Sequence, residues 1–249
     1  MVKTAENKTA KEWFKKWSNK YDKTLGKMKR HHDLLDLAVK MSAVKKNDKV
    51  LDMGCGTGFL SLKYMAKVPC TITAIDNSKE MLSIFKDKVK HLGLEYSVKC
   101  ILCDASDMKF KDNSFDIAAG TVALHHIKDK QPVINRIYKL LKPGGRIVIG
   151  ELDIDTTGKI DDIKRLKRIM EYLTEELTHA VKGAGEKALS QMFDNGKKHL
   201  LNDGEYCISA KQWANLCKKA GFKKINIGTV SSFKRLKVIA AVKLEGETT

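Results

Sequence analysis

A glycine-rich turn between two short apolar runs constrains this chain more than any other feature of its sequence. The first run and the turn occupy residues 49–59, and the second run, at residues 71–76, ends in a carboxylate. Within the turn, Gly54, Gly56 and Gly58 alternate with other residues. Glycine is needed where the backbone takes a positive φ or closely approaches a ligand. The pattern predicts a strand, a turn, a helix and a second strand, which is typical of a nucleoside-binding site.

The spacing of the glycines indicates which kind of nucleoside ligand fits. Dinucleotide-binding turns follow G-x-G-x-x-G and hold a pyrophosphate at a helix N-terminus, whereas this chain has G-x-G-x-G with Asp52 just before it. An acidic residue beside the turn argues against a phosphate group. Asp76 follows the turn by about 20 residues, where a carboxylate at the end of a second strand can accept ribose hydroxyls. We therefore expect a ligand that carries a ribose and no phosphates.

Five ordered segments give the chain a wider family resemblance. After the glycine turn come Asp104-Ala105, the strand-like residues 113–120, the stretch at 124–127 with two histidines, and residues 140–149, which contain Lys-Pro-Gly-Gly. In this order the segments resemble the class I S-adenosylmethionine-dependent methyltransferases of the small-molecule type. The resemblance implies S-adenosylmethionine as the methyl donor and S-adenosyl-L-homocysteine as the product.

The resemblance also implies a set of cofactor-binding residues, with the acid after the third strand and Met81 near the adenine. The set is Tyr21, Asp52, Gly54, Cys55, Gly56, Gly58, Asp76, Asn77, Met81, Asp104, Ala105, Gly120 and Thr121. Two of the acids have structural alternatives. Asp52 could instead order the glycine turn through backbone hydrogen bonds, and Asp76 could cap the helix that begins near Ser78.

Strands that alternate with helices predict an α/β fold. We expect a Rossmann-like, doubly wound, seven-stranded sheet that is mostly parallel with an antiparallel last strand and has helices on both faces. The expected strands are 48–53, 71–76, 96–102, 115–120, 146–151, 223–229 and 232–243. The expected helices are 31–44, 58–66, 77–91, 131–141, 160–181, 186–193 and 209–220.

Two segments extend this sheet domain. Residues 1–30 form the expected N-terminal lid segment, residues 31–249 a single methyltransferase domain, and residues 152–207 a helical cap inserted after the fifth strand. Within the lid segment, Trp13, Phe14, Trp17 and Tyr21 recur at helical spacing. This aromatic stripe either packs on the core or closes over the cofactor as a lid. The lid alternative draws on a resemblance to the W-x-x-x-Y-D segment of small-molecule methyltransferases.

Methyl transfer from a sulfonium needs aligned reactants and excluded water more than acid–base chemistry. An acceptor hydroxyl or protonated amine must nevertheless lose a proton, which histidine can take. His125 and His126 follow the fourth strand, and Tyr21 could pair with one of them, so these three are the predicted catalytic residues. Packing or helix capping is the alternative for the histidines. Glu151, at the end of the fifth strand, could face the acceptor or lie in solvent.

The net charge of +17 raises the alternative of an RNA or protein substrate. Only six of the 47 basic residues are arginine, the residue best suited to phosphate and base contacts. Residues 120–123 read Gly-Thr-Val-Ala where many base-amine methyltransferases carry Asn/Asp-Pro-Pro-Tyr/Phe. We therefore predict a small-molecule acceptor. A non-catalytic binding module is a third hypothesis, which the intact glycines and acids disfavour.

The spacing of the six cysteines predicts no metal site. Cys100 and Cys103 lie three apart on a predicted strand, where side chains point to opposite faces. No run of 18 apolar residues and no signal-peptide pattern occurs, so we expect a cytoplasmic protein. The acceptor atom and the oligomeric state cannot be read from these patterns.

Overall fold

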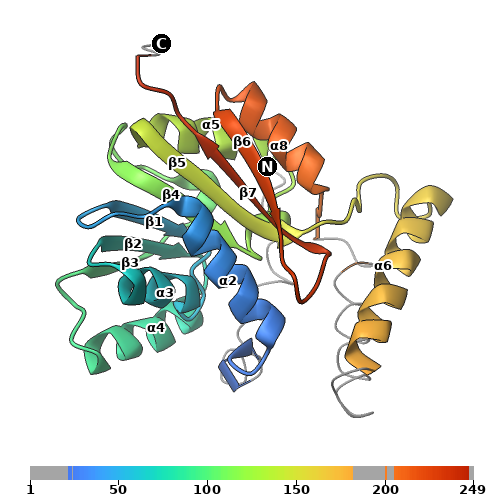
Figure 1. Cartoon of the computed structure of the whole chain (residues 1–249), viewed down its shortest axis with the longest axis horizontal. Helices are drawn as coiled ribbons and strands as arrows, with labels where there is room; N and C mark the ends of the chain where they lie inside the picture. Colours follow the sequence, from blue (N-terminus) through green and yellow to red (C-terminus); the bar gives the residue numbers. More distant parts are fainter. Residues whose placement is uncertain (1–21, 24, 182–199, 201–204, 247–249) are drawn as a thin grey trace.

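The computed structural model describes residues 22–23, 25–181, 200 and 205–246 (Figure 1). Its centre is a seven-stranded sheet with the strand order β3-β2-β1-β4-β5-β7-β6. The strands are β1 (Lys49–Met53), β2 (Thr71–Asp76), β3 (Val98–Leu102), β4 (Phe115–Thr121), β5 (Leu141–Leu152), β6 (Lys223–Thr229) and β7 (Leu236–Val242). The order reverses between β1 and β4, and ligands bind beyond the carboxyl ends of the strands at such a switch point.

The pairing of the strands confirms the predicted sheet. Neighbouring strands from β3 to β5 are parallel, whereas β7 runs antiparallel to both β5 and β6. Strands β2 and β6 occupy the predicted residues. The sheet is therefore the predicted Rossmann-like one, parallel except for its last strand in sequence.

Helices cover both faces of this sheet, as predicted. They are α2 (Lys29–Ser42), α3 (Phe59–Lys67), α4 (Lys79–His91), α5 (Gln131–Leu140), α6 (Ile163–Val181) and α8 (Ala210–Lys219), with 3-10 turns at Ala105–Asp107 and Leu124–His126. Helices α2, α3 and α4 pack on one face against strand residues such as Val50. Helices α5 and α8 pack on the other, against residues such as Leu51. Because successive strand residues point to opposite faces, burial on both sides explains the continuous apolar runs of the strands.

Helix α6 lies beside the sheet rather than over a face of it (Figure 1). Its contacts with the core come from Ile169, Tyr172 and Leu173. It also pairs Glu176 with Arg30 of α2, over 2.5 Å between a carboxylate oxygen and a guanidinium nitrogen. This ion pair ties the first part of the predicted cap to the helix that follows the N-terminal segment.

Two strands differ from the prediction by more than two residues. Strand β5 begins at residue 141 instead of 146, because the Lys-Pro-Gly-Gly segment, which was expected to be a turn, itself pairs with a neighbour. The amide of Gly144 donates to the carbonyl of Lys243, and the amide of Lys243 donates to that of Gly145. Strand β7 begins at residue 236 instead of 232, because residues 230–236 form turns.

Several predictions fall outside the described residues. These are the aromatic lid helix before residue 22, with Tyr21, and the short helix at 186–193. They and the division into a lid segment and a single domain stay predictions. Among the described helices, none combines the length and apolar character that a bilayer span requires.

Candidate active site

The glycine turn lies between the carboxyl ends of β1, β2 and β4. Its glycines have positive φ angles of 65° at Gly54, 53° at Gly56 and 90° at Gly58. A Cβ atom on Gly54 would lie 2.4 Å from the Cβ of Ala123, and one on Gly58 would lie 2.1 Å from the Phe85 ring. Both distances are shorter than any van der Waals contact. The turn therefore needs glycine for its backbone shape and for close packing.

Asp76 binds the glycine turn directly from the end of β2. One carboxylate oxygen accepts a hydrogen bond from the amide of Gly56 and the other accepts one from the amide of Ser78, each over 2.8 Å. Burial raises the pKa of the Asp76 carboxyl, against these backbone donors. Each carboxylate oxygen has a further lone pair, so both can still accept ribose hydroxyls.

The alternative role for Asp76, as the cap of the next helix, is not what the structure has. Ser78 is the N-cap of α4, and its hydroxyl accepts a hydrogen bond from the amide of Met81 over 3.2 Å. Asp76 instead supports this cap by binding the Ser78 amide. Its contact with a ribose stays a prediction.

Asp52 lies inside the protein at 1% exposure. The Ser61 hydroxyl of α3 donates a hydrogen bond to its carboxylate over 2.6 Å. Burial raises the pKa of Asp52 to about 7, although this hydrogen bond opposes the shift. This contact joins the end of β1 to α3 rather than to the glycine turn, so the alternative that Asp52 orders this turn also stays a prediction. A cofactor contact for Asp52 stays a prediction.

Other predicted cofactor residues divide into a group at the ends of β2 and β3 and a group buried in the core. Asn77 donates to Asp104 over 3.5 Å, which joins the ends of β2 and β3. Asp104 accepts hydrogen bonds from the amide and hydroxyl of Ser106 and so caps the 3-10 turn that begins at Ala105. By contrast, Cys55 and Met81 are buried in the core. The structure gives these last two side chains a packing role.

The end of β4 approaches the glycine turn closely. A Cβ atom on Gly120 would lie 2.9 Å from the carbonyl oxygen of Met53. Thr121 ends the strand, and the next residue, Val122, has a φ of 50° and donates its amide to the carbonyl of Gly150 over 2.8 Å. A β-branched residue rarely takes this left-handed conformation, so the backbone after β4 is strained. No pattern in the sequence predicts this strain.

His125 and Glu151 form a buried pair next to that backbone. The Nδ1 atom of His125 lies 2.8 Å from a carboxylate oxygen of Glu151, and the side chains are 6% and 2% exposed. The other oxygen of Glu151 accepts hydrogen bonds from the amides of Ala123 and Leu124. Glu151 therefore faces the histidine, and the alternative that it lies in solvent is wrong.

His125 and Glu151 shift each other's pKa. Burial lowers the pKa of His125, but the charge and hydrogen bond of Glu151 outweigh it and raise this pKa to about 8. Burial raises the pKa of Glu151, but His125 and the two backbone donors hold it below its usual range. Each partner therefore favours the charged form of the other.

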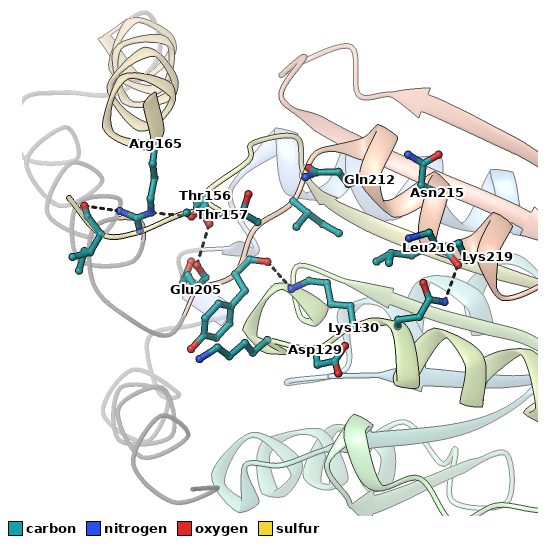
Figure 2. Close-up of a pocket in the computed structure, with 16 residues that line it drawn as sticks. Asp129, Lys130, Thr156, Thr157, Arg165, Glu205, Gln212, Asn215, Leu216 and Lys219 are labelled. Atoms are coloured by element: carbon teal, nitrogen blue, oxygen red, sulfur yellow. Dashed lines mark hydrogen bonds between the residues drawn. The ribbon is translucent and has the colours of Figure 1, made fainter. Parts of the chain in front are cut away.

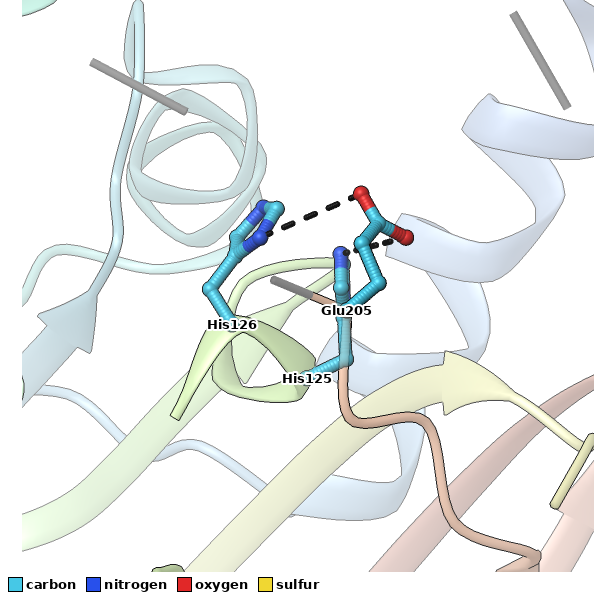
Figure 3. A group of neighbouring side chains, drawn as sticks. All are labelled: His125, His126 and Glu205. Atoms are coloured by element: carbon cyan, nitrogen blue, oxygen red, sulfur yellow. Dashed lines mark ion pairs between the residues drawn. The ribbon is translucent and has the colours of Figure 1, made fainter. Parts of the chain in front are cut away.

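Glu205 completes the group from the far end of the predicted insertion (Figure 3). Its two carboxylate oxygens lie 3.9 Å from Nε2 of His125 and 3.9 Å from Nδ1 of His126. The amide of Tyr206 donates to the carbonyl of His125 over 2.9 Å, which holds this segment against the histidines. Sequence reasoning missed Glu205, because a contact across 79 intervening residues leaves no local pattern.

The N-terminal segment reaches the glycine turn through Asp22. This residue ends the W-x-x-x-Y-D segment, and its carboxylate accepts a hydrogen bond from the hydroxyl of Thr57 over 2.6 Å. Lys88 of α4 lies 2.7 Å from the other oxygen and also donates to the carbonyl of Thr57. Tyr21 precedes Asp22 directly and lies outside the described residues.

A cavity of about 620 Å³ beside Glu205 is lined by residues of α5 and α8 and by residues of the segment 156–160 (Figure 2). Its buried cations are engaged by backbone carbonyls, since Arg165 donates to those of Thr156 and Leu200 and Lys130 to that of Tyr206. Burial also lowers the pKa of Lys130 to about 8. Among the described lining residues, none is a predicted cofactor residue, so this cavity is separate from the predicted donor site.

The sheet order, the glycine turn at the switch point and the acids beside it define a class I methyltransferase domain. In sequence, the methyltransferase domain family matches residues 44–221. The chain therefore belongs to the S-adenosylmethionine-dependent methyltransferases, as the resemblance of its motifs predicted.

Similar proteins extend this assignment. The chain is 34% identical over 115 residues to the ubiquinone/menaquinone biosynthesis C-methyltransferase UbiE of Psychromonas ingrahamii. This match covers 45% of this chain and 46% of that protein. It is 32% identical over 151 residues to the demethylmenaquinone methyltransferase of Listeria welshimeri, 59% of this chain and 63% of that one. The chain thus spans about half the length of the curated relatives it matches.

A solved structure with the same fold contains the expected donor. Phosphoethanolamine N-methyltransferase 2 of Haemonchus contortus, in complex with S-adenosyl-L-methionine, matches with a TM-score of 0.61 and 18% identity. The match covers 86% of this chain and 53% of that one. At this identity the likeness establishes the shared fold.

Proposed function

We propose that this protein transfers a methyl group from S-adenosylmethionine to a small-molecule acceptor. One juxtaposition carries the proposal. The glycine turn with Asp76 and the buried pair of His125 and Glu151 lie at neighbouring strand ends, and Gly54 and Ala123 pack together between them. Such an arrangement brings a donor site and an acceptor site into one crevice.

On the donor side, Asp76 holds the ribose hydroxyls and the positive-φ backbone from Gly54 to Gly58 passes under the nucleoside. Asn77, Asp104 and Ala105 lie at the adenine end. Support for a ligand without phosphates comes from the acids, because Asp76 and Asp52 would repel a pyrophosphate at this turn.

The acceptor is a small organic molecule. This part of the proposal draws on the names of the relatives, which denote methylation in ubiquinone and menaquinone biosynthesis. No observation favours the alternative of an RNA or protein substrate. Location in the cytoplasm is part of the same proposal and rests on the sequence alone.

His125, His126 and Tyr21 are the residues that activate the acceptor. Glu151 fixes the ring of His125 through Nδ1. The Nε2 atom of His125 then points to the side on which His126 and Glu205 lie. A polarised acceptor atom attacks the methyl carbon in line with the departing sulfur, and closure of the crevice excludes water. Tyr21 takes part because its neighbour Asp22 is anchored on Thr57 of the glycine turn.

Two measurements test the proposal. Calorimetry with S-adenosyl-L-homocysteine should give binding for the natural protein and at least about tenfold weaker binding for Asp76→Ala, since a charge-assisted hydrogen bond is lost. Asp116→Ala is the matched control, because that acid lies at the opposite end of the sheet and pairs with Lys142. Equal binding by both variants would contradict the assigned donor site.

The acceptor is sought with labelled S-adenosylmethionine and a fractionated cell extract, with and without nuclease. Label in the small-molecule fraction that survives nuclease treatment supports the proposal. Label that appears only in RNA or protein would overturn the acceptor class while leaving the donor intact.

A further inference from the structure

Two histidines and a carboxylate from distant parts of the chain converge beside the crevice. One ligand-type atom from each of His125, His126 and Glu205 lies within 4.8 Å of the others (Figure 3). The two distances from the imidazole nitrogens to the Glu205 oxygens are both 3.9 Å. Four-coordinate zinc with ligand bonds of about 2.1 Å separates its ligand atoms by roughly 3.4 Å. The two 3.9 Å distances involve different oxygens of Glu205, and the three ligand atoms lie within 4.8 Å of one another. Shifts of up to about 1.4 Å would therefore bring them to this separation.

The surroundings of His125 resemble those of a metal-binding histidine. Metal-bound imidazoles almost always donate their second nitrogen to a carboxylate or carbonyl, which fixes the tautomer and the ring orientation. Here Nδ1 of His125 binds Glu151, and Glu151 is itself held by the amides of Ala123 and Leu124. This arrangement directs Nε2 of His125 toward Glu205.

The backbone also holds the three residues together before any ion binds. The amide of Tyr206 donates to the carbonyl of His125, and the hydroxyl of Thr156 donates to the carbonyl of Glu205 over 3.1 Å. His125 and His126 are neighbours on one 3-10 turn, and their ring centroids are 4.1 Å apart. Preorganisation of this kind lowers the conformational cost of binding an ion.

We propose that His125, His126 and Glu205 bind a divalent transition-metal ion of the zinc type. Imidazole nitrogen with one carboxylate oxygen suits zinc and its neighbours better than magnesium or calcium, which prefer oxygen ligands. Three protein ligands leave a fourth position open, as in catalytic rather than structural zinc sites. That open position takes an oxygen or nitrogen atom of the small-molecule acceptor.

This inference rests on the proposed function for the position of the acceptor, and it changes how the histidines act there. They serve as ligands, and the ion lowers the pKa of a coordinated acceptor hydroxyl. That hydroxyl loses its proton to water, and its oxygen forms a bond to the methyl carbon of the donor. The bond from methyl carbon to sulfur breaks, its electron pair stays on sulfur, and S-adenosyl-L-homocysteine leaves.

Cobalt(II) alone is the probe, added to the tag-free, chelator-treated full chain. We expect ligand-field absorption in the visible that saturates at one equivalent, is displaced by zinc and lacks the intense charge-transfer band of cobalt–thiolate bonds. Glu205→Gln and His126→Asn should each weaken cobalt binding by at least about tenfold. His91→Ala, a change on the exposed end of α4, is the matched control and should leave it unchanged.

Binding of S-adenosyl-L-homocysteine by the same variants separates the two proposals. Variants that keep this binding are folded at the donor site, so their loss of cobalt absorption supports the metal site. The metal site is overturned if the natural protein shows no saturable cobalt absorption. It is also overturned if Glu205→Gln and His126→Asn both bind cobalt with the same absorption and affinity as the natural protein. Either result leaves the donor assignment standing.

Discussion

The hydroxyl of Thr57 donates a hydrogen bond to the carboxylate of Asp22 over 2.6 Å. This contact joins the segment before α2 to the glycine turn, 35 residues further along the chain. Lys88 binds the other oxygen of the same carboxylate at 2.7 Å and also donates to the Thr57 carbonyl. The segment before α2, the glycine turn and α4 therefore meet at Thr57.

Asp22→Asn should weaken binding of S-adenosyl-L-homocysteine several-fold while costing less than about 1 kcal/mol of folding stability, because the ion pair with Lys88 is partly exposed. Calorimetry and urea denaturation measure the two effects. Asp36→Asn breaks a comparable exposed pair with Lys63 and should change neither. If the two variants bind equally well, Asp22 has no part in holding the turn.

Gly58→Ala should destabilise the protein by more than about 2 kcal/mol, because a left-handed backbone is unfavourable for alanine and the new Cβ would meet Phe85. Gly93→Ala is the matched control. Gly93 has a φ of 66°, and a Cβ there meets nothing within 4 Å, so only the backbone cost of about 1 kcal/mol remains. If Gly58→Ala and Gly93→Ala unfold at the same urea concentration, the Phe85 ring moves aside without an energetic cost.

Asp52 should make stability depend on pH. Its folded pKa of about 7 lies above the ordinary value of 3.8, so between these values the folded state binds more protons than the unfolded state. The free energy of unfolding contributed by Asp52 therefore falls as pH rises through this window, by at most about 4 kcal/mol. Asp52→Asn should lack this fall.

Urea denaturation at about pH 5 and about pH 7.5 measures the difference between Asp52→Asn and the natural protein. Ser61→Ala provides the contrast, because it removes the hydrogen bond that favours the charged carboxylate. This variant should lose stability more steeply with rising pH than the natural protein. A difference that does not vary with pH would mean that Asp52 is charged throughout the range.

Val122 should be the position where glycine is more stable than alanine. Its φ of 50° costs any residue with a Cβ about 1–2 kcal/mol, whereas its side chain is 37% exposed and gains little from burial. We expect the free energy of unfolding of Val122→Gly to be about 1 kcal/mol higher than that of Val122→Ala. At most positions the alanine variant is the more stable of the two. The opposite order would contradict the left-handed backbone.

Much of this fold could be predicted, because its strands are punctuated by glycine and charged residues and its helices have clear amphipathic faces. Strand β5 was predicted too short because Pro143-Gly144-Gly145 has the composition of a turn, while its pairing with residue 243 depends on a strand about 100 residues away. Local composition cannot report such a partner.

The candidate site divides in the same way. The glycines and Asp76 follow from local spacing, and His125 and His126 from their place after a strand. Whether Glu151 faced solvent or the site could not be decided, since this depends on the amides of residues 123 and 124 turning toward it. Glu205 was missed because its approach to the histidines exists only in the folded chain.

The packing of Gly54 against Ala123 limits how this protein could be redesigned. The segment after β4 is held on one side by the glycine turn and on another by Glu151, so it tolerates little change in shape. Residues 156–160, by contrast, border the cavity beside Glu205 and carry none of the donor contacts described. Substitutions at Thr157 and Gly158 are therefore expected to disturb donor binding less than substitutions at Ala123 or Leu124.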